Sequence, residues 1–246
     1  MIKGILRKVI PKSIKKKLEP YRKQWQNFKI LAFEYGQWKT IKNWECIDKK
    51  GEPVPWFTYP AIEYLSHLDL SDFLVYEYGS GNSTLFWFKR VKEVVSVEHD
   101  KGWYEQILKK IDGIHKVKYF LFENAEDYIN SLTQHKQSFD IYVIDGRWRG
   151  ECAKTVLKHI NQYGGKMVIF DNSDWYPNAI RYLRQNLGWI QVDFHGFAPI
   201  NNYTLTTTIF LNKSITLKYK SVLFSLKAIK QNAEDDLNST ILEHGG

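Results

Sequence analysis

Apolar runs of four to seven residues alternate with stretches of helical spacing from about residue 56 to residue 211. Short apolar runs that end in turn residues are typical of buried strands, and apolar positions three and four apart are typical of amphipathic helices. Strands and helices that alternate in this way favour an α/β fold with a largely parallel sheet. The predicted strands are 73–78, 94–97, 116–122, 139–144, 166–170, 189–194 and 206–211, and the predicted helices are 83–90, 103–110, 128–132, 151–162 and 178–186.

Residues 75–100 form a strand–turn–helix–strand unit that carries the strongest chemical signal. The first strand breaks into Gly79-Ser80-Gly81-Asn82, and the second ends at Glu98. The two glycines let backbone N–H groups approach a ligand, and the helix N-terminus beyond them favours an anionic group. Glu98 lies 19 residues after Gly79, where a carboxylate can accept both hydroxyls of a ribose. The unit predicts a site for an adenosine-type cofactor; the alternative is an ordinary glycine turn near a surface glutamate.

Two residues narrow the choice of cofactor. Thr84 stands where the dinucleotide fingerprint G-x-G-x-x-G/A has glycine or alanine, and Glu77 would repel a pyrophosphate but suits a sulfonium and an α-amino group. Both residues disfavour an NAD-dependent oxidoreductase. The sequence EYGSGNST resembles the first motif, E-x-G-x-G-x-[ST], of the class I S-adenosylmethionine-dependent methyltransferases. That resemblance implies a Rossmann-like, doubly wound, seven-stranded sheet with helices on both faces, a last strand inserted antiparallel, and S-adenosyl-L-methionine as cofactor.

The resemblance also implies which residues hold the cofactor. The family's loop after the third strand touches the adenine, which brings in Asn124 and Ala125, although Asn124 is equally suited to cap the next helix. The implied cofactor-binding residues are Glu77, Gly79, Ser80, Gly81, Ser83, Thr84, Glu98, His99, Asn124, Ala125 and Asp145.

Oxygen-bearing side chains follow the strands 139–144 and 166–170. Ligands of open α/β sheets bind beyond the carboxyl ends of strands, so Asp145, Asp171 and Asn172 would converge if the two strands are neighbours. Two carboxylates and an amide oxygen suit Mg²⁺ or another divalent cation, which would lower the pKa of an acceptor hydroxyl. VIDGRWRG and VIFDNSDW resemble the metal-dependent O-methyltransferases of the catechol and macrocin types, which implies that these three residues are metal ligands.

Departures from that pattern keep alternatives open. The catechol type has a catalytic lysine where this chain has Trp148, so a lysine base has no support. Asp145-Gly146 is also a good turn, Asp171 or Asn172 could cap a helix, and Asp145 could act as a base without a metal.

The predicted activity is O-methylation of a hydroxyl on a sugar, a glycan precursor or another small molecule. Asp145 is the predicted catalytic residue and His195 a second candidate base; Tyr59, Arg147 and Arg149 are candidate acceptor-binding residues. The alternatives are a metal-free N- or O-methyltransferase and a non-catalytic cofactor-binding or scaffold protein at a membrane surface.

The net charge of +8 resides in residues 1–23, which carry nine basic residues and one acidic residue. The balanced remainder argues against a nucleic-acid partner, which would require a basic face on the fold itself. Apolar residues recur at helical spacing in this arm and Pro11 interrupts them, so it is predicted to lie on an anionic membrane, or alternatively to dock on the domain or a second subunit. The predicted organisation is an arm and linker over 1–55, the methyltransferase domain over 56–211, and a polar tail over 212–246 with a helical stripe at Tyr219, Val222, Leu223 and Leu226.

Two further observations concern location. Cys46 and Cys152 show no paired spacing, which fits a reducing compartment, and lysines and arginine interrupt the start of the chain, which does not resemble a signal peptide. The sequence therefore predicts a cytoplasmic protein, with peripheral contact at the inner face of the membrane if the arm binds lipid. It leaves the oligomeric state open.

Overall fold

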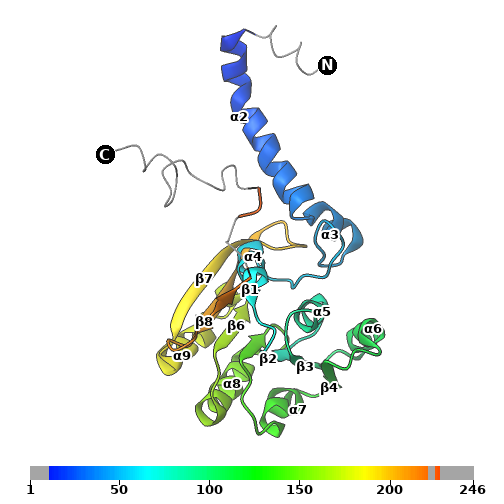
Figure 1. Ribbon diagram of the computed structural model, residues 1–246, viewed down its shortest axis with the longest axis vertical. Coiled ribbons are helices and arrows are strands. Elements are labelled where there is room, and N and C mark those ends of the chain that lie inside the picture. The colour runs from blue at the N-terminus through cyan, green and yellow to red at the C-terminus, as the bar shows by residue number, and fades with distance from the viewer. Residues whose placement is uncertain (1–10, 221–224, 228–246) are drawn as a thin grey trace, which may run out of the picture.

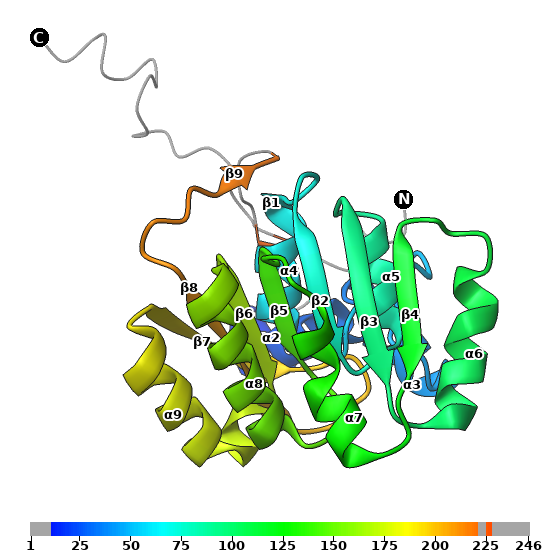
Figure 2. The same cartoon turned by 90° about the horizontal axis from the view of Figure 1, so that it is seen from below.

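A seven-stranded sheet in the order β4-β3-β2-β5-β6-β8-β7 forms the centre of the computed structural model, which describes residues 11–220 and 225–227 (Figures 1 and 2). All neighbouring pairs are parallel except those of β8, which runs antiparallel between β6 and β7. The strands are β2 Leu74–Tyr78, β3 Glu93–Glu98, β4 Val117–Leu121, β5 Ile141–Ile144, β6 Met167–Asp171, β7 Ile190–Phe197 and β8 Thr204–Leu211.

Helices cover both faces of this sheet (Figure 2). The helices that follow or precede the strands are α4 Tyr59–His67, α5 Asn82–Phe88, α6 Lys101–Ile111, α7 Ala125–Asn130, α8 Arg149–Tyr163 and α9 Pro177–Leu187, with short 3₁₀ turns η2 Ser131–Gln134 and η3 Ser173–Trp175. The doubly wound fold, the seven strands and the inserted antiparallel strand are confirmed.

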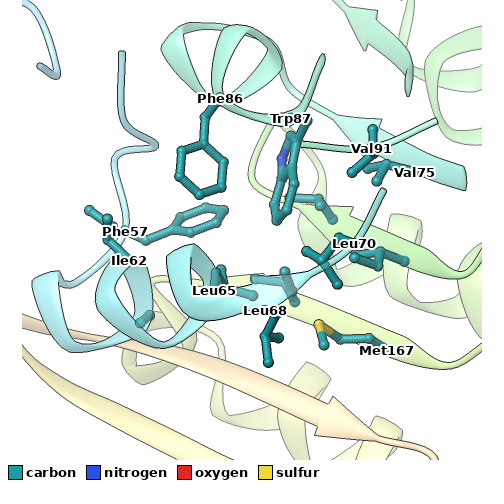
Figure 3. Close-up of a cluster of buried hydrophobic side chains, with 14 of the residues drawn as sticks. Phe57, Ile62, Leu65, Leu68, Leu70, Val75, Phe86, Trp87, Val91 and Met167 are labelled. Carbon is teal, nitrogen blue, oxygen red and sulfur yellow. The ribbon is translucent and has the colours of Figure 1, made fainter. Parts of the chain in front are cut away.

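Alternation along the strands divides the core in two. Val75 of β2 belongs to the cluster under α4 and α5, and its neighbour Tyr76 belongs to the cluster under α7, α8 and α9. Figure 3 shows the first cluster, where Phe57 and Leu65 meet Trp87 over the sheet. Because β2, β5 and β6 are buried on both faces, their sequences are apolar apart from Glu77 in β2 and Asp171 at the end of β6.

The N-terminal arm has two parts. Helix α2 (Lys12–Lys29) begins after Pro11, stands away from the sheet, and buries none of its residues (Figure 1). The π-helical turn η1 (Ile30–Glu34) and helix α3 (Gln37–Asn43) then bring the chain back to the domain. Gln37 Nε2 donates to the backbone carbonyls of Ala198 and Asn201, and Cys46 and Val54 join the core. Part of the segment before residue 56 therefore packs with the sheet domain.

Segments at both ends of the domain show local detail. Phe57 is fully buried in the core, whereas Trp56 is exposed and its indole donates to Asn201 Oδ1. The helix expected around Tyr219 is wrong at that residue, because β9 (Lys218–Tyr219) pairs antiparallel with β1 (Leu68–Asp69). Val222 and Leu223 of that stripe, and the first ten residues of the arm, lie outside the described residues.

Candidate active site

The glycine loop lies where the chain changes direction across the sheet. Strand β2 has β3 on one side and β5 on the other, and ligands of doubly wound sheets bind at such a switch point. Gly79 has φ +90°, and a Cβ there would lie 2.6 Å from the Cα and N atoms of Gly146. A Cβ on Gly146 would in turn lie 2.0 Å from Tyr128 Oη. The loops after β2 and β5 thus meet backbone to backbone, and the sequence indicated Gly146 only as a turn residue, not as a contact of Gly79.

Glu77 lies buried beneath this loop. Its Oε2 accepts from Thr84 Oγ1 at 2.5 Å and from Ser96 Oγ at 2.7 Å, whereas Oε1 has no partner among the described residues. Burial raises the pKa of Glu77 to about 7, against the lowering effect of these hydroxyls and of Ser83. The β-branched Thr84 also accepts from the Gly81 N–H at 3.2 Å, so it connects the loop to the acid.

Glu98 ends β3 on the other side of the loop. Its Oε2 accepts from the N–H and the hydroxyl of Ser80, at 3.0 and 2.8 Å, and its Oε1 accepts from the N–H groups of His99 and Asp100. The residue is 4% exposed, and its carboxylate faces the glycine loop. A ribose would have to replace the Ser80 hydroxyl at Oε2.

Aromatic side chains surround Glu98 and the loop. The rings of His99, Tyr128 and Trp148 meet edge to face, with centroids 5.5 to 5.8 Å apart. Trp103 Nε1 donates to Ser80 O at 2.7 Å, and Tyr119 Oη lies 2.6 Å from Ser80 Oγ. The sequence placed His99 near an adenine but did not identify these aromatic neighbours, because the partners of His99 come from α7 and the loop after β5, and those of Ser80 come from α6 and β4.

Asn124 and Ala125 begin α7. Asn124 Oδ1 accepts from the Asp127 N–H at 2.8 Å and its Nδ2 donates to the Asp127 carboxylate. The alternative role of Asn124, as a helix cap, is therefore the one the structure shows, and both ends of its amide are engaged.

Arg149 joins the ends of β5 and β6. Its guanidinium donates to three backbone carbonyls: Nε to Gly146 O, Nη1 to Asp171 O and Nη2 to Asp145 O. It also contacts two side chains, since Nη1 donates to Asn172 Oδ1 and Nη2 lies 3.1 Å from Asp145 Oδ1. A guanidinium has five N–H donors, and these five acceptors match them in number. Arg149 was predicted to bind an acceptor, but its guanidinium is engaged inside the protein; Arg147, by contrast, is exposed.

The expected metal ligands do not fit a cation in this arrangement. Asn172 Oδ1 and the Asp145 carboxylate face the Arg149 guanidinium, and Asp171 Oδ1 accepts from Thr207 Oγ1 at 2.6 Å in a fully buried position. The prediction of a divalent metal at Asp145, Asp171 and Asn172 is thus not supported, because a cationic side chain already lies between the strand ends. No group of three or more His, Cys, Asp or Glu side chains suited to a metal occurs among the described residues.

Asp145 and Asp171 remain close enough to influence each other. Burial raises the pKa of Asp145 to about 6, with Arg149 opposing the shift, and burial together with Asp145 raises the pKa of Asp171 well above its usual range. A largely buried carboxyl with a raised pKa at a strand end is a candidate proton acceptor.

The segment after α3 covers this region. Asn82 Nδ2, in the first turn of α5, donates to Cys46 O at 2.6 Å, and the charges of Asp145 and Asp171 help burial to raise the pKa of the Cys46 thiol. Tyr59, predicted to face an acceptor, is instead buried, 4.5 Å from the ring of Tyr35. Its hydroxyl has no partner among the described residues.

His195 belongs to a different part of the surface. Its Nδ1 lies 2.8 Å from Thr206 Oγ1, and it lines a hollow of about 320 Å³ beside α9 together with Asp174, Arg181 and Asp193. Thr207, the residue after Thr206 in β8, points to the opposite face of the sheet and donates to Asp171. The structure therefore does not bring His195 to Asp145.

No protein-family model matches the sequence, and no curated protein matches it. Solved structures match the fold. The O-methyltransferase TomG of Streptomyces achromogenes, in complex with S-adenosylmethionine, is 13% identical with a TM-score of 0.47, over 62% of this chain and 76% of that one. The N-methyltransferase NodS of Bradyrhizobium japonicum, in complex with S-adenosyl-L-homocysteine, is 11% identical with a TM-score of 0.42, over 58% and 80%. Precorrin 8W decarboxylase of Methanobacterium thermoautotrophicum is 17% identical with a TM-score of 0.43, over 65% and 93%. At these identities the likeness concerns the fold alone.

Proposed function

We propose that this chain, whose sheet has the strand order and antiparallel insertion expected of class I methyltransferases, binds S-adenosyl-L-methionine and methylates a hydroxyl of a sugar, glycan precursor or similar small molecule. The cofactor, when bound, supplies an electrophilic methyl group on a sulfonium. The remaining argument concerns what the side chains of this protein do.

The observation that carries the proposal is the unpartnered Oε1 of Glu77. A buried polar atom without a hydrogen bond costs about 1–3 kcal/mol, so its position requires a reason, and a group of a bound ligand is one such reason. This one lies beneath a glycine loop at the switch point of the sheet, where a cationic amino group would satisfy it. A phosphate would be repelled there, which disfavours a dinucleotide.

Glu98 and the aromatic residues beside it suit an adenosine. Glu98 presents a carboxylate at the carboxyl end of β3, next to the rings of His99 and Trp148. In this arrangement the carboxylate would bind the ribose hydroxyls, and the aromatic rings beside it would contact the adenine.

Asp145 is the candidate general base. It follows β5 directly, next to the glycine loop, and its raised pKa keeps it close to the range in which a carboxylate accepts a proton effectively. Asp145 takes the proton from the acceptor hydroxyl as that oxygen bonds to the methyl carbon and the carbon–sulfur bond breaks. Arg149 orients Asp145 and supplies the positive charge that a metal would otherwise bring to this end of the sheet.

Calorimetric titration with S-adenosylhomocysteine tests the cofactor site. We expect micromolar binding by the wild type, at least tenfold weaker binding by Glu77→Gln and Glu98→Ala, and unchanged binding by Glu93→Ala, which removes a carboxylate from the opposite end of β3. Binding of NAD, or of neither ligand, would overturn the proposal.

An acceptor screen then tests the chemistry. Asp145→Asn should still bind S-adenosylhomocysteine but lose turnover on any acceptor found, and EDTA should leave the wild-type rate unchanged. Full turnover by Asp145→Asn would show that Asp145 is not the base. A chain that binds the cofactor but methylates nothing would be a binding or scaffold protein.

A further inference from the structure

Helix α2 presents an apolar stripe that nothing in the described structure covers. Its five members recur at intervals of four and three residues, which places them along one line of the helix. Every one of them is 41–75% exposed, and the whole helix buries none of its residues. The stripe consists of Ile14, Leu18, Tyr21, Trp25 and Phe28.

The stripe continues past the end of the helix as a series of aromatic rings. Trp25 stacks on Phe28 with centroids 5.1 Å apart, Phe28 meets Phe33 edge to face at 6.1 Å, and Phe33 lies 6.5 Å from Trp38. All four rings are exposed. We call these four residues the aromatic ladder. Large exposed apolar patches on a folded chain mark an interaction surface.

Cations flank this apolar line. Seven of the eighteen residues of α2 are Lys or Arg, and Glu19 is the one acid among them. At helical spacing, Lys17 falls on one side of the stripe and Arg22 and Lys29 on the other. The Lys29 ammonium lies 5.4 Å from the centroid of the Trp25 ring.

A second copy of α2 is a poor partner for this face. Intervals of four and three residues are also those of a two-stranded coiled coil, whose flanking positions must carry opposite charges to attract each other. The flanking positions here hold Lys15, Lys17, Arg22, Gln24 and Lys29, so either orientation of two copies would bring like charges together. Tyrosine and tryptophan, in addition, favour an interface between an apolar phase and water.

We propose that α2 and the aromatic ladder bind the surface of an anionic lipid bilayer, with the helix lying parallel to it. The stripe enters the boundary between head groups and acyl chains, and the flanking lysines and arginines contact the negatively charged head groups. This surface is separate from the methyl-transfer site, so either proposal can fail alone.

Flotation of the full-length protein with vesicles tests this inference. We expect binding to vesicles of phosphatidylcholine with one-quarter phosphatidylglycerol, little binding to phosphatidylcholine alone, and release by high salt. Substituting the flanking lysines Lys15, Lys17 and Lys29 by Ala should weaken binding by about fivefold per lysine, on the order of a hundredfold together. The double variant Trp25→Ser, Phe28→Ser should weaken it by at least about tenfold.

Matched controls keep the outcome specific. The control for the lysines is a variant in which three exposed lysines of the sheet domain are changed to Ala: Lys136, Lys158 and Lys213. The control for the aromatic residues is Trp175→Ser, at an equally exposed tryptophan in η3. Both variants should bind vesicles as the wild type does. Equal loss in the two lysine triples would overturn the inference, because it would reduce the effect to net charge. So would the absence of vesicle binding, or a dimer in light scattering that Trp25→Ser dissociates, which would assign the face to a second copy.

Discussion

Glu77 shows, at the scale of a single residue, a conflict between stability and binding. Folding transfers its carboxyl from water to a buried position, where one oxygen has two hydroxyl partners and the other has none. The pKa rises from an ordinary value near 4.5 to about 7, so the folded protein binds a proton more tightly than the unfolded chain does. The contribution of Glu77 to stability should therefore be greatest at low pH and decline between about pH 4.5 and 7 as the buried group ionises.

Glu77→Gln should remove this pH dependence. The amide oxygen can still accept from Thr84 and Ser96, but no charge is buried, so the variant should be more stable than the wild type at pH 8 by on the order of 2–3 kcal/mol. The two proteins should differ little at pH 5. Urea unfolding at both pH values measures the difference, with Glu93→Gln, at a partly exposed glutamate paired with Lys118, as the control. Equal pH dependence in wild type and Glu77→Gln would contradict the assignment, as would a variant that became more stable and bound cofactor normally.

Arg149 provides a second test at the same scale. Arg149→Met would leave the buried Asp145 and Asp171 without their cation and three strand-end carbonyls without a donor, so unfolding should require about 3–5 kcal/mol less. Arg147→Met, two positions away and exposed, should cost less than about 0.5 kcal/mol. Denaturant titration compares them. Millimolar Mg²⁺ should leave the wild-type midpoint unchanged, and a clear increase would show that these oxygens hold a metal after all.

The site residues could be predicted from the sequence where their proximity follows from their spacing along the chain. Glu77, Thr84 and Glu98 lie in one strand–turn–helix–strand unit, so their proximity to the glycine loop could be predicted from residue numbers. The role of Arg149 could not, because most of its acceptors are backbone carbonyls, which no sequence pattern displays. The same three positions that suggest a metal site, two Asp and one Asn, are equally the acceptors that a buried arginine requires.

At the scale of elements, the contact between Gly79 and Gly146 determines how closely the ends of β2 and β5 approach each other. Gly146→Ala would place a Cβ 2.0 Å from Tyr128 Oη and 2.8 Å from Gly79 N, so the two loops must separate. We expect a loss of about 1–3 kcal/mol in stability and weaker binding of S-adenosylhomocysteine. Adding Tyr128→Phe removes the closer clash and should recover part of the stability, whereas Gly150→Ala, which meets nothing within 4 Å, should have no such effect. Urea unfolding of the double variant decides the matter: if it is no more stable than Gly146→Ala alone, Tyr128 is not the obstacle.

Elements differ in how well the sequence predicts them, for a physical reason. The strands β2, β5 and β6 are buried on both faces and read directly as apolar runs, and Pro11 marks the start of α2. The β1–β9 pair was not predicted because each strand is two residues long and the partners lie about 150 positions apart. Likewise, the aromatic partners of His99 come from two other segments, and only the fold brings them together.

On the scale of the whole molecule, the chain separates into a charge-balanced sheet domain and a basic helix that adds nothing to its core. The sequence showed this separation, since residues 1–23 carry the entire net charge. It did not locate where the arm joins the domain, because Gln37 and Cys46 are fixed by contacts with the distant residues Ala198 and Asn82. Among the described residues, no helix is both long and apolar enough to cross a membrane.

This division predicts two very different rates of amide hydrogen exchange. Helix α2 buries no side chain, so it opens without disturbing the core, and isolated helices of about this length are marginally stable in water. Its amides should exchange within seconds, whereas those of β2, β5 and β6, whose strands are almost entirely buried, should exchange only with global unfolding. Mass spectrometry of peptides from both regions measures this, and anionic vesicles should slow α2 selectively because a helix at the bilayer surface is more ordered than one in water. Slow exchange of α2 in free protein would mean that another surface already covers the stripe, and a concentration dependence of that protection would identify the surface as a second copy of the chain.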